Sequence, residues 1–415
     1  MAITKRMTKR MVLGMIEPTY ADPAATPTSA SNMILLKDVD LTPIDGQTVE
    51  RGLVQPAYGN QGKMLTGNHT KLTFKVEIAG SGAAGTAPLY DPLLQGCGLS
   101  PTVMAAGTTA AAAVPAETAV GRFTYAATAP YTGAVDRVVT LTCTTAGASG
   151  VATFTVSSPA GLGLAAVNTA GVVMTTGMAF ALANGATITP AAIGTAFVLG
   201  DVFTIELRSP RVRYRPVSSS FASVVFFTFV DGILHRIRGS RGTVGVEFTV
   251  QQIPMFSFEY TGLYAEPVDL APGAFNRAGW VDPLEVSDRN TPDFRLAGRD
   301  MILQSLQLNL ANDVKYKNRV NQEEVTIDDR KPSGSIKVAA LNLGDFNPYA
   351  YATNHTMVPF YLRHGRSAGN IVMLSGTRGQ LLRPKYQDQD GDVFYDMPFE
   401  PQPDAGDDEI ILDVA

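Results

Sequence analysis

The feature that most constrains this chain is an alternation of apolar and polar side chains with a period of two. It is clearest in four segments, at residues 72–77, 246–250, 256–260 and 306–310. Successive side chains of a strand point to opposite faces, so each segment predicts a strand with one buried face. Hydrophobic residues make up 45% of the 415 residues, which is enough for such strands to bury a core.

Gly and Pro residues separate the predicted strands, and helix signals are sparse. One short helix is predicted from Pro88 to Gln95, with Thr86 as its N-cap and Gly96 and Gly98 as stop signals. The predicted fold class is therefore all-β with minor helix. The predicted turns are Asp231-Gly232, Pro332-Ser333-Gly334 and Asp390-Gly391.

The composition changes abruptly near residue 103. From Val103 to Ile205 the chain consists mainly of Ala, Thr, Gly and Val. Short alternating segments such as RVVTLTC and DVFTIEL lie between Gly/Ser turns, which predicts an inserted immunoglobulin-like β-sandwich at 103–205. A low-complexity linker is the alternative, although a linker would not need the Val/Phe/Thr alternation. The only charged residues of the segment are Glu117, Arg122, Asp136, Arg137 and Asp201.

The chain also resembles itself, which indicates a duplication. Met-Ile-Leu opens two segments, at 33–35 and at 301–303, and Val39 and Leu41 then correspond to Leu306 and Leu308. We predict a first unit at 1–102 and 206–298 and a second at 299–415. The second copy lacks the segment PLYDPLLQGCG, for which DFNPYAYATN near Asp345 is the nearest substitute. Chance likeness between β segments is the alternative.

Charge and cysteine content argue against several protein classes. The 33 Lys and Arg residues face 38 Asp and Glu residues, a net charge of −5, which disfavours tight nucleic-acid binding. Cys97 and Cys143 are too few for a disulfide framework or a multi-cysteine metal site, and we expect buried thiols. The apolar run from Met11 to Ile16 is short for a signal peptide and nothing approaches a membrane span, so we expect folding in a cytoplasm.

Two motifs suggest ligand sites. Gly80, Gly82 and Gly85 form G-x-G-x-x-G between a predicted strand and the predicted helix. No βαβ pattern and no suitably placed acidic residue follows, so we predict a strand-to-helix connection and not a dinucleotide site. The segment YQDQDGDVFYD could offer Asp388, Asp390, Asp392 and Asp396 to calcium, but its glycine is misplaced for an EF-hand, and a hairpin turn is predicted instead.

No catalytic or metal constellation is recognisable, and we predict a protein that is not an enzyme and uses no cofactor or metal. The four histidines are scattered without metal spacing and are expected in turns or on the surface. The aromatic residues of IPMFSFEYTGLY fit core packing better than a base-stacking platform. The histidines are His69, His235, His355 and His364, and the aromatic residues are Phe256, Phe258, Tyr260 and Tyr264.

The polar segment from Gly46 to Gly67 is long for a hairpin connection, where a few residues are usual. Loops of this length within β proteins are often functional. Leu53, Tyr58 and Met64 lie among its polar residues, which suits docking to a partner. A floppy loop is the alternative.

Several of these segments together resemble the major tail tube proteins of long-tailed, non-contractile bacteriophages. GMIEPTYADPAATPTSASNMILLKDVDLTPIDG is similar to the family's N-terminal segment, and FKVEIAGSGAAGTAPLYDPLLQGCG to its strand, glycine connection and helix. GSRGTVGVEFTVQQIPMFSFEYTGLYAEP is similar to its recurrent strands. The resemblance covers most of the chain outside the insert and implies tail-tube β-sandwich or barrel units.

The resemblance implies a structural virion protein that is assembled in the host cytoplasm. Such subunits form rings, the rings stack into a hollow tube around a tape-measure protein, and DNA later passes without specific binding. Tail-tip and tail-terminator proteins would be further partners, and the insert would decorate the outside, so that its removal leaves assembly intact. The long hairpin loop would contact the neighbouring ring, through Arg51, Leu53, Tyr58, Lys63 and Met64.

Two units per chain would make a ring of six units from three chains, with pseudo-sixfold symmetry. A plain ring of six one-unit chains is the alternative. A different class also remains open, namely a secreted or cell-surface binding or adhesion protein built from β-sandwich modules. A signal peptide or paired cysteines would favour that class, and the sequence shows neither.

Overall fold

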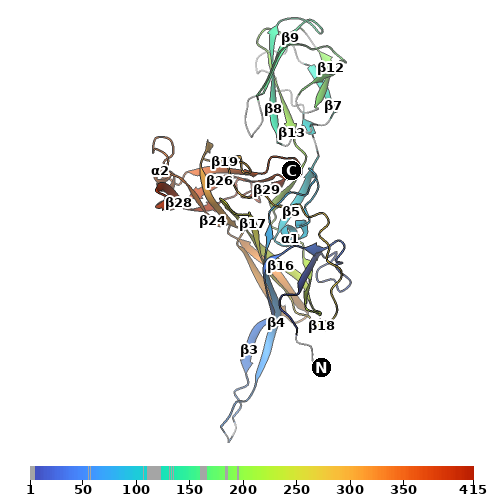
Figure 1. The fold of residues 1–415 in the computed structure, drawn as a ribbon, viewed down its shortest axis with the longest axis vertical. Helices are drawn as coiled ribbons and strands as arrows, with labels where there is room; N and C mark the ends of the chain where they lie inside the picture. The colour runs from blue at the N-terminus through green and yellow to red at the C-terminus, as the bar shows by residue number, and fades with distance from the viewer. Residues whose placement is uncertain are drawn as a thin grey trace.

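The computed structural model describes residues 5–54, 56, 58–105, 107–109, 123–129, 131, 133, 135–158, 166–182, 186–193 and 196–415. The described chain is nearly all β, with two short helices, α1 (Asp91–Gly96) and α2 (Pro348–Thr353). A central body lies between two extensions, a long hairpin at one end and a set of small sheets at the other (Figure 1). The predicted all-β class with minor helix is confirmed at this level.

The body contains two successive sets of strands. The first set is β1 (Arg10–Ile16), β2 (Met33–Ile34), β3 (Lys37–Glu50), β4 (Lys63–Glu77), β5 (Leu99–Met104), β14 (Arg211–Pro216), β15 (Val224–Val230), β16 (Ile233–Thr249), β17 (Met255–Leu263) and β18 (Val268–Asp269). The second set is β19 (Asp293–Leu296), β20 (Arg299–Asp300), β21 (Leu303–Asn309), β22 (Asn312–Arg319), β23 (Gln322–Arg330), β24 (Ser333–Ala339), β25 (Met357–His364), β26 (Val372–Leu381), β27 (Lys385–Gln389), β28 (Asp392–Pro401) and β29 (Ile411–Val414).

The predicted alternation produces the core of the body. On β4, Leu72, Phe74 and Val76 are buried, while Thr73 and Lys75 between them are half-buried on the other face. Phe256, Phe258 and Tyr260 on β17 and Leu306 and Leu308 on β21 are buried in the same way and belong to the same core cluster. These strand predictions, and the prediction that the aromatic residues of β17 are core residues, are confirmed.

Eight strands of the body form one continuous antiparallel ribbon. In spatial order they are β3, β4, β17, β16, β21, β24, β28 and β27. One face of the ribbon carries the core residues and the other is polar. The pair β16–β21 is the join between the first set of strands and the second.

The pairing of the strands repeats from the first set to the second. Strand β1 pairs with β2 and β15, and β19 pairs with β20 and β25 in the same way. The hairpin β15–β16 has its counterpart in β25–β26, and the run β3–β4–β17 in β21–β24–β28. Helix α1 follows β4 as α2 follows β24. The second set therefore begins at β19, a few residues before position 299.

Strands β6 to β13 pair only with each other among the described residues. They form one sheet in the order β10, β9, β8, β13, β6 and another in the order β11, β12, β7, around a separate core. The chain leaves and re-enters the body at neighbouring positions, because Met104 of β5 pairs with Arg211 of β14. The bounds are β6 (Gly107–Thr109), β7 (Phe123–Ala129), β8 (Arg137–Thr145), β9 (Thr153–Ser158), β10 (Val167–Val173), β11 (Phe180–Ala181), β12 (Thr187–Ile193) and β13 (Val202–Arg208). Glu117 and Arg122 lie outside the described residues.

Two local predictions are wrong. Helix α1 begins at Asp91 and not at Pro88, and Thr86 does not cap it: Pro88 accepts a hydrogen bond from the Asp91 amide, forming a turn before the helix. Gly334 lies within β24, opposite Leu308, and not in a turn. Glycine is required there because an added Cβ would approach the Gln307 carbonyl to 2.0 Å. The Asp231-Gly232 and Asp390-Gly391 turns are confirmed as two-residue hairpin loops with positive φ at all four positions.

Candidate assembly surfaces

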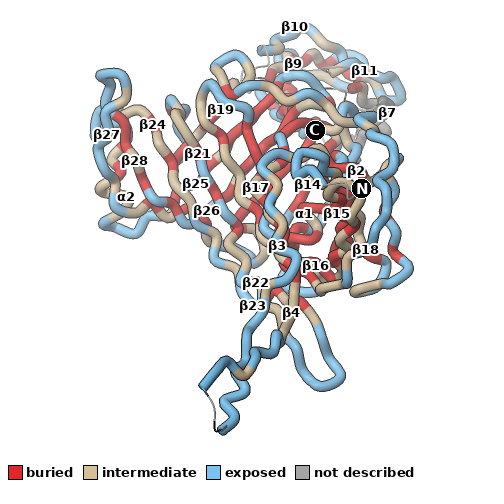
Figure 2. The backbone as a smooth tube through the Cα atoms, turned by 60° about the horizontal axis from the view of Figure 1, so that its bottom comes forward, coloured by how far each residue is buried: buried red, intermediate tan, exposed pale blue. Residues whose placement is uncertain are grey.

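The predicted polar loop at 46–67 is for the most part strand. β3 continues to Glu50 and β4 starts at Lys63, so only residues 51–62 connect them. The prediction of a loop failed there because both faces of this hairpin are solvated, so its sequence lacks an apolar alternation. The hairpin projects from the body and is exposed along its distal half (Figure 2).

The five predicted contact residues all lie in this distal half. Arg51, Leu53 and Tyr58 belong to the connection, and Lys63 and Met64 open β4. All five are exposed, Tyr58 with a relative accessibility of 110%. Lys63 Nζ lies 2.6 Å from Glu50 Oε1 and closes the end of the ladder. The tip thus presents apolar side chains that no described residue covers.

The root of the hairpin is fixed by charge and stacking. Lys71 Nζ lies 2.8 Å from Asp45 Oδ2, and this hydrogen bond lowers the pKa of Asp45. The ring of His69 stacks on Tyr316 of β22 at 4.9 Å between centroids. These contacts orient the β3–β4 hairpin against the shorter hairpin formed by β22 and β23.

The β22–β23 hairpin is itself anchored to the body. Arg241 Nη1 donates to the Val325 carbonyl at 2.8 Å, and the Val325 amide donates to the Tyr20 hydroxyl at 2.6 Å. The Arg241 guanidinium also lies over the Tyr20 ring at 4.9 Å. Two hairpins at matching places in the strand order therefore differ: one projects with an exposed tip, and the other is held to the body at Val325.

The eight-stranded ribbon ends in two open edges. Among the described residues, β3 pairs only with β4, and β27 pairs only with β28. Each edge carries apolar side chains on the core face: Val39 and Leu41 on β3, both half-buried, and Tyr386 on β27, which is 64% exposed. An open edge presents unpaired backbone groups and is a template for pairing with another chain.

The polar face of the ribbon is rich in charges of both signs. Strand register places side chains from all eight strands on this face, where the Gly245–Ser257 and Gln307–Ser335 region forms a shallow hollow. Its acidic members slightly outnumber its basic ones. The acidic residues are Asp40, Asp45, Glu77, Glu247, Glu259, Asp392, Asp396 and Glu400, and the basic residues are Lys37, Lys71, Lys75, Lys337 and Lys385.

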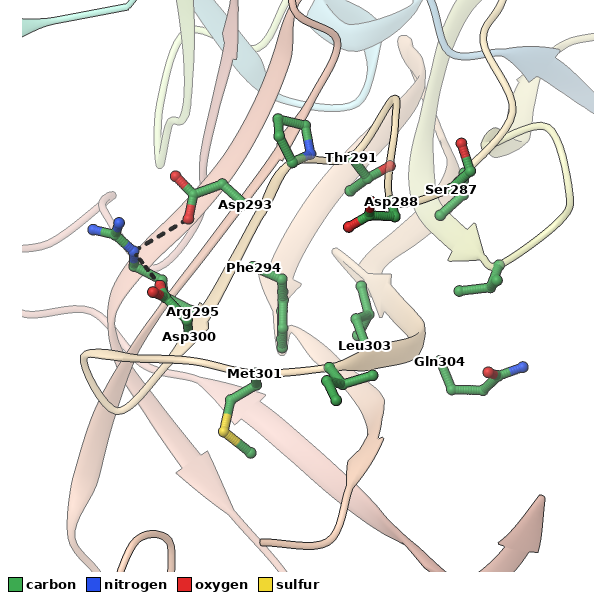
Figure 3. A pocket seen from close by; sticks show the side chains of 14 residues that line it. Ser287, Asp288, Thr291, Asp293, Phe294, Arg295, Asp300, Met301, Leu303 and Gln304 are labelled. Carbon is green, nitrogen blue, oxygen red and sulfur yellow. Dashed lines mark hydrogen bonds and ion pairs between the residues drawn. The ribbon is translucent and has the colours of Figure 1, made fainter. Parts of the chain in front are cut away.

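A pocket of about 580 Å³ lies at the ribbon end opposite to the hairpin tip, beside Thr249 and Leu303 (Figure 3). Arg295 Nε contacts Asp293 Oδ1 at 3.2 Å and Asp300 Oδ1 at 2.8 Å. Burial raises the pKa of Asp293, while Arg295 opposes that shift. The pocket therefore combines an apolar floor, including Phe294, with a charged rim.

The glycine motif is a contact between the two sets of strands. The amides of Gly80 and Gly82 donate to Asn370 Oδ1 and to the Gly369 carbonyl, both at 2.8 Å. A Cβ on Gly80 would lie 2.1 Å from that carbonyl, and Gly82 and Gly85 have φ of +86° and +77°. The predicted strand-to-helix connection is confirmed, and these two amides are engaged by the protein itself.

The other candidate ligand sites do not converge. Asp388 lies in β27 and Asp390 in the two-residue turn that follows it, where Asp388 Oδ1 accepts from the Gly391 amide. No group of three or more His, Cys, Asp or Glu residues suited to a metal occurs in the part of the chain that the structure describes. Cys97 and Cys143 are buried free thiols, as predicted.

The expectation for the histidines holds only in part. His355 lies in an exposed turn with φ of +53°, as predicted. His364 on β25 is buried, contacts the Phe248 ring edge-on at 5.7 Å, and its Nδ1 lies 2.9 Å from Thr291 Oγ1. Burial lowers the pKa of His364 to about 4. No strand is predicted around His364 from the sequence, so nothing there indicated this burial.

Sequence reasoning also missed the β27 edge. The segment KYQDQ has one apolar residue, Tyr386. The predicted Asp390-Gly391 hairpin turn implies a strand on each side of it, but it does not indicate that one of these strands ends a sheet. Among the described residues, no helix has the length and apolar character needed to cross a membrane. No family model matches the chain, and no curated protein matches it.

Proposed function

We propose that this protein is the subunit of a hollow tube built from stacked rings, as in the tail of a long-tailed, non-contractile bacteriophage. Each chain contributes two units of the same plan, and three chains complete a ring with pseudo-sixfold symmetry. The inserted sheets form an immunoglobulin-like domain on the outside.

The observation that carries this proposal is the repeated strand pairing that ends in two open edges. A ribbon with one free edge at each end can close only by pairing with further copies, and such head-to-tail contacts generate rings. The β16–β21 pair already joins one unit to the next within the chain. Repetition of that join between chains would give a barrel of twenty-four strands from three eight-stranded ribbons.

The polar face of the ribbon suits the lumen of such a barrel. The opposite face carries the core cluster and cannot face water. Acidic residues slightly outnumber basic ones on the polar face, which repels the phosphate backbone and lets DNA slide. The tape-measure protein would occupy the same space before DNA passes.

The projecting hairpin suits the contact between rings. Its tip points away from one end of the ribbon, and the pocket beside Thr249 and Leu303 lies at the other end. In a stack, the tips of one ring therefore approach the pocket end of the next. The exposed carboxylates of Asp288 and Asp300 on the rim suit Arg51 of the tip.

Negative-stain electron microscopy of the purified chain, alone and with the tail-tip and tape-measure proteins, tests the proposal. We expect hollow tubes, either spontaneously or after nucleation by the tip proteins. Globules that fail to polymerise under both conditions would contradict a tube function. That result would favour the second candidate, a β-sandwich binding or adhesion protein at a cell surface.

A further inference from the structure

We infer that the β27 edge of one copy pairs antiparallel with the β3 edge of a second copy, in the register set by the β16–β21 pair. In this register Tyr386 lies opposite Leu41, Gln387 opposite Asp40, and Asp388 opposite Val39. The inference rests on the proposed ring and specifies which strands close it and how they align.

The register follows from equivalent positions in the two sets of strands. The starting point is the correspondence of Val39 and Leu41 with Leu306 and Leu308 in the two Met-Ile-Leu segments. Leu72 lies opposite Leu41 and Gly334 opposite Leu308, so the two are equivalent on β4 and β24, and so are Phe74 and Ile336 two residues further on. Phe258 and Met397, which lie opposite Phe74 and Ile336, are then equivalent on β17 and β28. 

The same count across β17 and β28 fixes the other edge. Val246 lies opposite Phe256, and Tyr386 lies opposite the equivalent residue, Tyr395. Within the chain, Val246 pairs with Leu308. Tyr386 is the equivalent of Val246, and Leu41 is the equivalent of Leu308. The pair between copies is therefore Tyr386 with Leu41, and this one pair defines the whole register.

The backbone groups of both edges point the right way for this pairing. In the β16–β21 join, Leu310 donates to the Val244 carbonyl and Val250 to the Gln304 carbonyl, so the even-numbered residues of β16 form the hydrogen-bonded pairs. The equivalent residues of β27 are Tyr386 and Asp388. Because Gln389 and Asp392 flank a two-residue loop and bond each other, Tyr386 and Asp388 direct their amides and carbonyls away from β28.

On β3, the side chain of Arg10 reveals the outward direction. Arg10 Nη1 donates to the Val39 carbonyl at 2.5 Å, so this carbonyl points away from β4. Leu41, two residues on, has the same orientation. In the free chain the Arg10 side chain occupies the Val39 carbonyl, which protects the edge from indiscriminate pairing. When the second copy pairs, Arg10 leaves this carbonyl or shares it with the incoming amide, because a carbonyl oxygen can accept two hydrogen bonds.

The side chains also match across the inferred contact. In the internal join, Gln307 Nε2 lies 3.3 Å from Glu247 Oε1 on the polar face. The equivalent pair between copies is Asp40 with Gln387, again one carboxylate and one amide. On the core face, Tyr386 would cover Leu41 and Val39, and its large exposed area would become buried.

Paired cysteines test the register in the assembled protein. Asp40→Cys with Gln387→Cys places two thiols in a non-hydrogen-bonded pair between copies, where the Cα atoms lie close enough for a disulfide. Glu247→Cys with Gln307→Cys is the matched control, because it reproduces the same pair within one chain. Leu41→Cys with Gln387→Cys is the slipped control, whose side chains face opposite sides. The native cysteines are buried and do not interfere.

After mild oxidation, non-reducing electrophoresis should show loss of the single-chain band for the Asp40/Gln387 variant and a ladder that ends at three chains. The Glu247/Gln307 variant should cross-link only within its chain, and the slipped variant should stay single. Tubes that form normally without the Asp40/Gln387 cross-link, or with cross-linking of the slipped pair, would overturn the register and leave the tube function intact.

A second pair keeps the test decisive if the first substitution blocks assembly. In the same register Thr42 lies opposite Lys385, in the next non-hydrogen-bonded pair on the same polar face. The Thr42→Cys with Lys385→Cys variant should therefore cross-link equally. If the unmodified chain forms no rings, even with the tail-tip proteins, the inference falls together with the proposed function.

Discussion

Two hairpins that occupy matching places in the repeated strand order differ in length and in how they are held. The β3–β4 hairpin has strands of 14 and 15 residues and an exposed tip. The β22–β23 hairpin has strands of 8 and 9 residues, turns at Val320-Asn321, and is held by Arg241 and Tyr20. The first set of strands thus has a projecting hairpin, the arm (β3–β4), where the second set has a short hairpin fixed to the body, the brace (β22–β23).

The join between the two sets of strands shows a second contrast. β16 and β21 pair with each other within the chain, whereas the outer sides of β3 and β27 have no partner strand among the described residues. The proposed duplication would account for both facts, because linking two units satisfies one contact and leaves one edge at each end. The differences between the copies are therefore the places where assembly should be most sensitive to change.

The largest effect is expected from removing the arm. Replacing residues 51–62 by Asn-Gly joins Glu50 to Lys63 through a two-residue hairpin turn and should leave the body folded. We expect rings that do not stack, and thus complete loss of long tubes in electron micrographs. The matched control, Val320→Thr in the brace hairpin, should form normal tubes. Tubes of normal length from the shortened arm would show that the arm does not join rings.

A substitution at the open edge should prevent ring closure without unfolding the chain. Tyr386→Pro removes an amide that points away from β28, so the free chain should keep its free energy of unfolding within about 1 kcal/mol. The neighbouring Gln387→Pro removes an amide that bonds β28 and should lower that free energy. Analytical ultracentrifugation and urea unfolding separate the two effects. Rings formed by Tyr386→Pro would contradict β27 as an assembly edge.

Core substitutions test whether the two sets of strands form one folding unit. Phe258→Ala and Met397→Ala remove side chains from one shared cluster, and each should lower the free energy of unfolding by about 2–5 kcal/mol. Both should shift the same calorimetric transition. Phe203→Ala, in the core of the small sheets, should shift a different one. If Phe258→Ala moved only part of the body transition, the two sets would be independent domains.

The smallest effect concerns pH at the seam between the sets, where His364 packs on Phe248. Burial lowers the pKa of His364 to about 4 from an ordinary value of 6.5. Above pH 6.5 the histidine is neutral in both states and contributes no pH dependence. Between pH 6.5 and 4 the unfolded chain binds a proton that the folded chain does not, so stability falls as the pH falls.

Urea midpoints at about pH 7.5 and pH 5 measure this dependence. The wild-type midpoint should drop on acidification, and His364→Phe should remove part of the drop. An equal drop in both proteins would show that other groups cause the acid sensitivity.

The sequence predicted those parts of the fold in which burial imposes alternation. Leu72 to Val76 and Phe256 to Tyr260 lie in strands with one buried face, so their pattern reports their structure. The correspondence of Val39 and Leu41 with Leu306 and Leu308 falls on strands that occupy matching places in the strand order, β3 and β21. The sequence predicts a loop for distal β3 and β4, because neither face of this hairpin is buried and its residues therefore show no apolar alternation.

The candidate surfaces were less predictable because an edge is defined by the lack of a neighbouring strand on one side. The residues of KYQDQ do not indicate that β27 lacks a second neighbouring strand. That becomes apparent only when the pairing of all described strands is known. The predicted Thr86 cap failed for a similar reason, since the Pro88 turn and packing of α1 decide where the helix begins. The tip residues were accessible to sequence reasoning because apolar side chains in a polar hairpin are conspicuous.

Cryo-electron microscopy of assembled tubes, viewed end-on and classified by symmetry, tests the central claim most directly. The claim is that the join between β16 and β21 within one chain repeats between chains. It predicts rings of three chains with six similar lobes and a lining of twenty-four strands. Rings of six chains would contradict it, because the β16–β21 join would then have no counterpart in the contact between subunits.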